Sequence, residues 1–135
     1  MSGLGSIAGW QYLGVNNFVP FNCGLVNETL QDGTTTYVSD ANIGDADWYS
    51  IAPLAATPAS VVAVTTRGFC EKSDAGTRLM AMQLRSGGTT VQSPAPALGT
   101  NFQWLWRTDM VDPATGGAWS AAAVNNVNIG PIITG

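Results

Sequence analysis

The chain has 135 residues with a formal net charge of −4, and only 10% of its residues are charged although 45% are hydrophobic. This length predicts a single domain, and five basic residues that form no run argue against direct binding to nucleic acid. No apolar stretch reaches the roughly 18 residues that would indicate a membrane span, so we expect no membrane contact.

The low charge content is the most informative feature of the composition. Soluble domains usually contain about 25% charged residues. A chain with 10% is either an exported protein with a Ser/Thr/Asn surface or a subunit that buries much of its surface against neighbours. We favour the second explanation, because the cores of protein interfaces are depleted of charged residues.

The first part of the chain predicts a short arm followed by several strands. Residues 1–9 are mostly small and predict a flexible N-terminal arm, and residues 10–135 are expected to form the domain. Asp32-Gly33 is a strong turn pair. Apolar alternation and β-rich composition predict one or two strands in residues 8–21 and single strands in residues 25–30, 34–38 and 48–52.

The middle of the chain contains the clearest strand pattern. Residues 59–70 begin with apolar side chains on both faces, which predicts a central strand. A turn at residues 73–76 then leads to residues 77–84, which we expect to return as the hairpin partner of that strand. Residues 89–92 predict a short strand, and residues 102–107 predict the last long one.

The C-terminal part predicts a turn, a short helix and a closing strand. Asp112-Pro113-Ala114-Thr115-Gly116-Gly117 supplies the fixed φ of proline and the backbone freedom of glycine for a turn. Ser120 is the expected N-cap of a helical turn at residues 120–127. Residues 128–134 predict a strand, and because Pro131 cannot donate to a ladder we expect it at an edge or a bulge.

These elements predict an all-β fold. About eight short strands are separated by turn signals every 8 to 14 residues or so, which is the spacing of an antiparallel β-sandwich or barrel. A jelly roll is our first prediction and an immunoglobulin-like sandwich the second, since strand spacing does not separate the two.

One loop has the composition of a weak calcium site. Asp40, Asn42, Asp45 and Asp47 place four oxygen-bearing side chains within eight residues. Calcium takes six to eight oxygen ligands, and short carboxylate-rich loops supply them. The alternative is an Asx-rich turn that joins two strands, and we otherwise expect no cofactor.

Tryptophans provide the other candidate residues. Phe102, Trp104 and Trp106 share one face of a predicted strand, where an aromatic stripe at period 2 is typical of a sandwich core. The functional alternative is an exposed face that stacks on sugar rings or contacts a neighbouring subunit. Trp10 and Trp119 are further candidates for core or interface positions.

The two cysteines, Cys23 and Cys70, have no partner pattern for a metal site, and the chain contains no histidine. In a cytosolic product they are expected to be reduced thiols packed as small apolar groups. A disulfide between them remains the alternative.

We expect no catalytic residues. The acid/base candidates are carboxylates such as Glu28, Glu71 and Asp74, and nothing marks two of them as the pair that a glycan hydrolase requires. Charges of both signs gather near residues 67–78 and are interpreted as a solvated or subunit-bridging salt-bridge cluster. The chain is therefore expected to be a structural or binding protein.

The C-terminal sequence from Asp112 to Ser120, of the form D-P-x-T-G-x-x-W-[ST], resembles the ending of small jelly-roll proteins encoded in the structural gene clusters of tailed bacteriophages. Residues 33–38 are similar to their DG-x-T-x-Y-V segment, and residues 45–49 resemble their GD-x-D-x-[YF] segment. Residues 62–78 are similar to their central hairpin.

This resemblance implies a non-enzymatic virion structural protein, made in the cytoplasm of the host bacterium. We expect a capsid decoration or cement protein that self-associates and contacts other virion proteins. Two alternatives remain open: a tail or tail-fibre component, or a carbohydrate-binding module for host attachment whose partner is a surface glycan.

Overall fold

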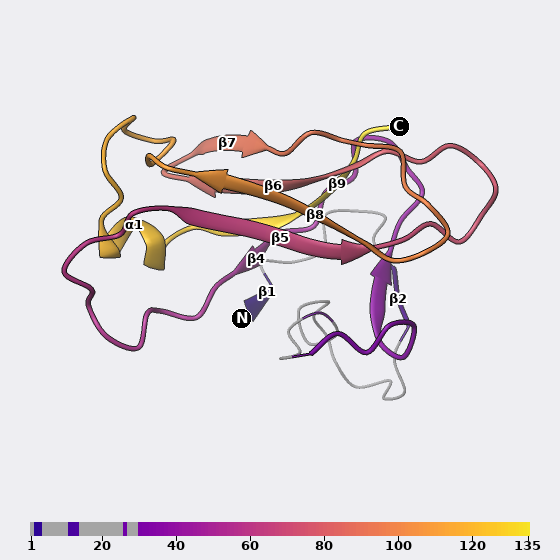
Figure 1. Ribbon diagram of the computed structural model, residues 1–135, viewed down its shortest axis with the longest axis horizontal. Coiled ribbons are helices and arrows are strands. Elements are labelled where there is room, and N and C mark those ends of the chain that lie inside the picture. The colour runs from indigo at the N-terminus through magenta and orange to yellow at the C-terminus, as the bar shows by residue number, and fades with distance from the viewer. Residues whose placement is uncertain (1, 4–10, 14–25, 27–29) are drawn as a thin grey trace.

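The computed structural model, which describes residues 2–3, 11–13, 26 and 30–135, is an all-β sandwich with one short helix (Figure 1). The strands are β1 (Ser2–Gly3), β2 (Gln11–Leu13), β3 (Tyr37–Ser39), β4 (Tyr49–Ser50), β5 (Val64–Cys70), β6 (Met80–Ser86), β7 (Thr89–Gln92), β8 (Gln103–Asp109) and β9 (Asn128–Ile133). The helix is α1 (Ala121–Asn125). The all-β prediction is confirmed.

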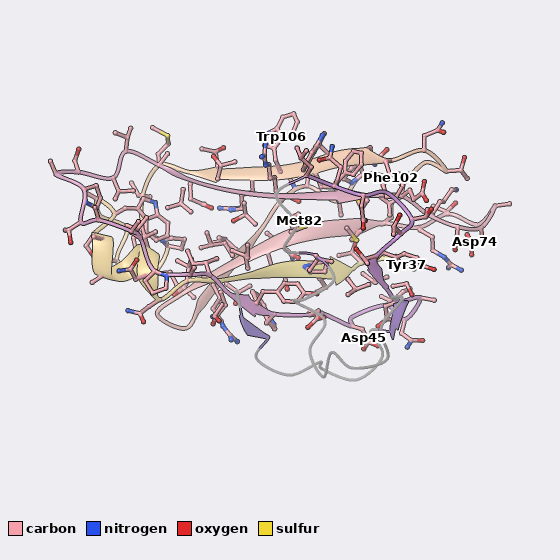
Figure 2. All side chains as sticks on the ribbon, turned by 90° about the horizontal axis from the view of Figure 1, so that it is seen from below. Tyr37, Asp45, Asp74, Met82, Phe102 and Trp106 are labelled. Carbon is pink, nitrogen blue, oxygen red and sulfur yellow. The ribbon has the colours of Figure 1, made fainter. Side chains whose placement is uncertain are left out.

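The strands form two main layers. A five-stranded antiparallel sheet has the order β1-β4-β9-β6-β7, and the β5–β8 pair forms a second, two-stranded layer. Figure 2 shows the β5–β8 layer above the larger sheet, with Met82 between them. A further small pair, β2–β3, joins Gln11–Leu13 to Tyr37–Ser39.

The core lies between the two layers in two clusters. One cluster consists of Met80, Met82, Leu98, Leu105 and Ile133. The other consists of Leu84, Trp119, Val124 and Val127. β6 contributes Met80 and Met82 to the first cluster and Leu84 to the second, so this strand runs through both parts of the core.

Strand β6 is the central strand of the molecule. Its residues from Met80 to Leu84 are all buried, and it pairs with β9 on one edge and β7 on the other. A tight turn through Gly87 and Gly88, with φ of 51° and 92°, returns the chain into β7. The prediction that residues 59–70 form the central strand is therefore wrong.

The predicted hairpin between residues 59–70 and 77–84 is also wrong. β5 pairs along its full length with β8, from Val64 opposite Asp109 to Cys70 opposite Gln103. The chain between β5 and β6 instead crosses from one layer to the other. The physical reason is that β6 is buried on both faces and pairs with β9 and β7 on its two edges, which leaves no edge for β5. β5 instead carries exposed polar side chains on one face.

The two layers lie close together at a glycine. A Cβ added to Gly68 of β5 would lie 2.5 Å from the Sδ atom of Met82 on β6. A larger side chain there would require the Met82 side chain to move, because protein interiors are close-packed. Gly68 therefore allows β5–β8 to lie against the central strand.

Strand β9 lies between β4 and β6 rather than at an edge, which corrects the prediction for residues 128–134. The backbone nitrogen and oxygen of a strand residue point the same way, and the carbonyl of Pro131 accepts from the N–H of Asp47 at 3.2 Å. The nitrogen of Pro131 therefore also faces Asp47, where the β4–β9 ladder is interrupted. The missing N–H is tolerated at this gap.

The predicted helical turn is confirmed. The Oγ of Ser120 accepts the N–H of Ala123 at 3.0 Å and so caps α1. The preceding turn is held by Asp112, whose Oδ1 accepts the N–H of Ala114 at 3.0 Å and whose carbonyl accepts the N–H of Gly116 at 2.7 Å. Gly116 adopts a φ of 70°, a conformation that favours glycine.

The start of the chain differs from the expected flexible arm at two residues. Ser2 and Gly3 form β1, which pairs with β4 at the edge of the five-stranded sheet. Residues 4–9 of the expected arm and most of the strands expected in residues 8–21 and 25–30 lie outside the described residues.

Gly130→Ala should destabilise the fold strongly, because a Cβ at this position would overlap the carbonyl oxygen of Asp47, in the segment that leads into β4. Forcing extra atoms into a packed site typically costs about 1–3 kcal/mol. Urea unfolding measures the change. The control is Gly117→Ala, whose new Cβ would meet only the Thr115 hydroxyl at 3.6 Å; equal stability of the two variants would contradict the close approach of Asp47 to Gly130.

Asp112→Asn should reduce the loss of folding stability that the protein shows as the pH falls below about 6. Hydrogen bonds from Ser86 and from the Ala114 N–H hold the pKa of Asp112 below its ordinary value. A depressed native pKa contributes stability that is present above the unfolded value of about 3.9 and is lost as pH falls through the native pKa. Thermal melts from about pH 6 to about pH 2 should show a smaller loss in the variant; parallel profiles would contradict this role.

Candidate functional site

The outer surface of the β5–β8 layer exposes two tryptophans. Trp104 is 42% exposed and Trp106 is 64% exposed, whereas Leu105 between them faces the core. Figure 2 places Trp106 on the side of this layer that faces away from Met82. The interpretation of this tryptophan pair as core is therefore wrong, and the exposed alternative describes them.

The inward side of β8 explains this reversal. Arg107 and Asp109 point inward and form an ion pair, in which Nε of Arg107 donates to both carboxylate oxygens of Asp109 at 2.9 and 2.8 Å. Nη1 of Arg107 also donates to the carbonyl of Gln92 at 2.7 Å. Because these charges are paired and hydrogen-bonded, they can occupy the inner face of a strand.

Residues from both strands make up the exposed surface, which we call the aromatic face. Its members alternate with the inward residues and are Thr65, Arg67, Phe69, Phe102, Trp104, Trp106 and Thr108. β5 and β8 position them through their antiparallel register, in which Arg67 is opposite Trp106 and Phe69 is opposite Trp104. The pleat then directs these side chains to the same side of the sheet.

Four planar groups of the aromatic face lie in a row. The rings of Phe102 and Phe69 are stacked with centroids 4.8 Å apart and an interplanar angle of 12°. Phe69 and Trp104 are also 4.8 Å apart, with a tilt of 41°. The guanidinium carbon of Arg67 lies 4.9 Å from the centre of Trp104, a cation–π contact that ends the row.

Arg67 differs from the other basic residues of the chain. Each of the other four has a polar partner: Lys72 with Gly76, Arg78 with Asp74, Arg85 with Asn128, and Arg107 with Asp109. Within the described part of the chain, Arg67 has no such hydrogen bond or ion pair. Its five N–H donors are therefore available to a ligand.

A hollow of about 400 Å³ lies on the aromatic face, lined by Thr65, Arg67, Trp104, Trp106 and Thr108. The hydroxyls of Thr65 and Thr108 are 2.9 Å apart and bond to each other across the two strands. The lining offers aromatic surface, one cation and two hydroxyls, but no carboxylate or thiol. This composition suits binding by stacking and hydrogen bonding rather than acid/base or nucleophilic chemistry.

The other tryptophan candidates have different outcomes. Trp119 is buried, and its Nε1–H donates to the carbonyl of Asp109 at 2.9 Å, so it is a core residue. Trp10 lies outside the described residues. Arg67 was not expected as a binding residue, although its position opposite the tryptophans would have been found by pairing residues 65–69 with residues 104–108.

The structure does not assemble the calcium candidates into a cation site. Oδ1 of Asp40 accepts the N–H of Asn42 at 2.8 Å, which confirms the Asx-turn interpretation for this residue. Asp47 is buried, and its oxygens accept from the Trp48 N–H and the Tyr49 hydroxyl. Asp45 accepts from the side-chain amide of Asn42 at 3.1 Å. Among the described residues, no group of three or more His, Cys, Asp or Glu side chains is placed to hold a metal ion.

Cys70 is a free, half-buried thiol that contacts the carbonyl of Gln103 at 3.6 Å. Burial raises its pKa to about 11. The thiol is therefore protonated at neutral pH and packs as a small apolar group. Cys23 lies outside the described residues, and Cys70 forms no disulfide in the structure.

The predicted salt-bridge cluster exists in part. Arg78 and Asp74 form an exposed ion pair at 2.7 Å, and Lys72 donates to the carbonyl of Gly76 at 2.6 Å. This pair lowers the pKa of Asp74, mainly through the hydrogen bond from Arg78. Exposed pairs of this kind contribute little to stability.

Comparison with known proteins identified no relative. The chain matches no protein-family model, no curated protein and no solved structure. Within the described residues, no helix has the length and apolar character needed to span a membrane.

Trp119→Phe and Trp106→Phe should separate core from surface. Trp119→Phe removes the Nε1–H donor to the buried carbonyl of Asp109, and an unsatisfied buried acceptor costs about 1–3 kcal/mol. Trp106→Phe changes an exposed side chain and should alter the unfolding free energy by less than about 0.5 kcal/mol. Chemical denaturation of both variants tests this; a larger loss for Trp106→Phe would contradict the assignment.

Proposed function

We propose that the chain is a non-enzymatic structural protein of a bacteriophage particle, a jelly roll of the capsid-decoration type. Three observations support this proposal: the resemblance of residues 112–120 to the ending of such proteins, the low charge content, and an exposed apolar surface at one end of the sandwich. The apolar surface carries the argument, because it indicates how the subunit would associate.

This surface, which we call the apolar end, consists of Val62, Met110 and Val111. They are 73%, 62% and 48% exposed. Val62 precedes β5 and the other two follow β8, so all three lie beyond the same end of the β5–β8 ladder, the end that adjoins α1 (Figure 1). Leu54, 39% exposed, lies in the loop tied to α1 by a hydrogen bond from its N–H to Asn125.

Apolar groups that gather at one place on the surface favour association. Removing apolar surface from water is worth about 25 cal/mol per Å². A neighbouring subunit that covers Val62 and Val111 would therefore gain free energy without having to desolvate charged groups. We propose that further copies of this chain and other virion proteins are these neighbours.

The proposed place of action is the virion, after synthesis in the cytoplasm of the host bacterium. The resemblance applies equally to a tail or tail-fibre component, in which the same apolar end would contact a tail protein. The aromatic face supports a second role, binding of a glycan, which is developed below.

Replacement of the apolar end by polar residues should weaken self-association. The wild-type protein should form a trimer or larger assembly, and Val62→Ser combined with Val111→Ser should raise its dissociation constant at least about tenfold, the equivalent of 1.4 kcal/mol. Light scattering on a sizing column, over a range of protein concentrations, measures the solution mass.

The matched control is Ile43→Ser, because Ile43 is 73% exposed but lies in the loop between β3 and β4. This variant should keep the wild-type mass. A wild-type protein that stays monomeric at every concentration would contradict the proposed self-association. An assembly that survives the double substitution would contradict the role of the apolar end.

A further inference from the structure

We infer that the aromatic face is a saccharide-binding site and that its ligand is an acidic sugar, such as a uronic acid residue within a glycan. The ring of this sugar would lie on Trp106, and its carboxylate would bind Arg67. The site shares no residue with the apolar end, so it adds a function to the proposed structural role.

Trp106 provides the stacking surface. Trp104 and Trp106 lie two residues apart on one face of β8, a separation of about 6.6 Å. Trp104 is occupied by the guanidinium of Arg67, whereas Trp106 is the more exposed of the two, with 64% of its surface free. A pyranose ring has an apolar face of C–H bonds, which are attracted to the negative face of an indole ring.

Arg67 provides the positive charge that would bind the carboxylate of the sugar, and its guanidinium contacts Trp104. Its guanidinium carbon lies 4.9 Å from the centre of the Trp104 ring, at the end of the row that runs from Phe102 through Phe69 to Trp104. This cation–π contact uses none of the N–H donors of Arg67, and within the described residues none of them has a hydrogen-bond or ion-pair partner. A carboxylate can accept two of these N–H groups in parallel, which is a strong and geometrically specific interaction.

The remaining lining of the hollow suits sugar hydroxyls. The hydroxyls of Thr65 and Thr108 bond to each other at 2.9 Å and retain further hydrogen-bonding capacity. The volume of about 400 Å³ lies at the lower end of the range for small-ligand sites. The site therefore fits one or two sugar units.

Two other occupants are disfavoured by charge. A single-stranded nucleic acid also stacks on aromatic rings, but it requires a groove with several cations. Four of the five basic residues of this chain are already engaged, and the net charge is −4. A second copy of the chain would have to insert a carboxylate into the hollow to pair with Arg67. Self-association through the apolar end needs no such charge pair, so we expect copies of the chain to associate there.

The test is a titration of the full chain with defined oligosaccharides. Acidic probes are tetragalacturonate, a hyaluronan tetrasaccharide and sialyllactose, and neutral probes are cellotetraose and maltotetraose. Isothermal calorimetry and tryptophan fluorescence report binding up to millimolar ligand. We expect at least one acidic probe to bind at least tenfold more tightly than both neutral probes.

Two variants assign the interaction to residues. Trp106→Ala should reduce the affinity of the binding probe at least tenfold. Arg67→Met keeps an unbranched stem against Trp104 but removes the charge, so it should abolish the preference for acidic over neutral sugars. Arg78→Met removes an exposed arginine elsewhere and should leave binding unchanged. Circular dichroism melts verify that each variant is folded.

The inference is overturned if none of the acidic probes binds, or if neutral probes bind as well as acidic ones. It is also overturned if Trp106→Ala keeps the wild-type affinity and Arg67→Met keeps the wild-type preference for acidic sugars. Loss of self-association in Trp106→Ala would identify a second copy as the occupant and would likewise overturn it. None of these results depends on the outcome of the substitutions at the apolar end.

Discussion

The burial of β6 on both faces is the constraint on which the rest of the structure depends. A strand whose residues are buried on both sides must lie inside a sheet and must be covered. Accordingly, β7 and β9 pair with its edges, and β5–β8 packs on the face formed by Met80, Met82 and Leu84. Gly68 permits this packing by leaving room for Met82. Once the β5–β8 layer lies there, its opposite face points to solvent and forms the surface at which we propose that a sugar binds.

The inner face of β8 shows how polar groups decide which side of a strand is buried. An inward Arg107 without partners would be unfavourable by several kcal/mol. Here it is neutralised by Asp109 and satisfied by the Gln92 carbonyl, while Leu105 fills the apolar part of the interface. The indoles of Trp104 and Trp106 alternate with these inward residues along β8 and therefore face outward, although tryptophan is typical of a core.

The two exposed surfaces suit different kinds of partner. The apolar end has hydrophobic side chains from Val62, Met110 and Val111. Such a surface gains free energy from any neighbour that excludes water, as in a subunit contact. The aromatic face combines a flat ring, a directed cation and hydroxyls, and such a set selects a ligand by its chemistry. A particle protein with both would be held by one surface and free to bind through the other.

Local features were predictable from the sequence alone, and long-range pairing was not. The Ser120 cap, the turn at Asp112 to Gly117 and the strand segments follow from interactions between residues close in sequence. The cap and the turn are confirmed, and from residue 34 onwards each predicted strand segment overlaps a strand of the structure. The pairing of strands depends on contacts between residues distant in sequence. Here β5 pairs with β8 and not with β6, the next strand along the chain. The exposure of the tryptophans and the availability of Arg67 followed from that pairing, because a strand has two faces and only its packing partners determine which one meets water.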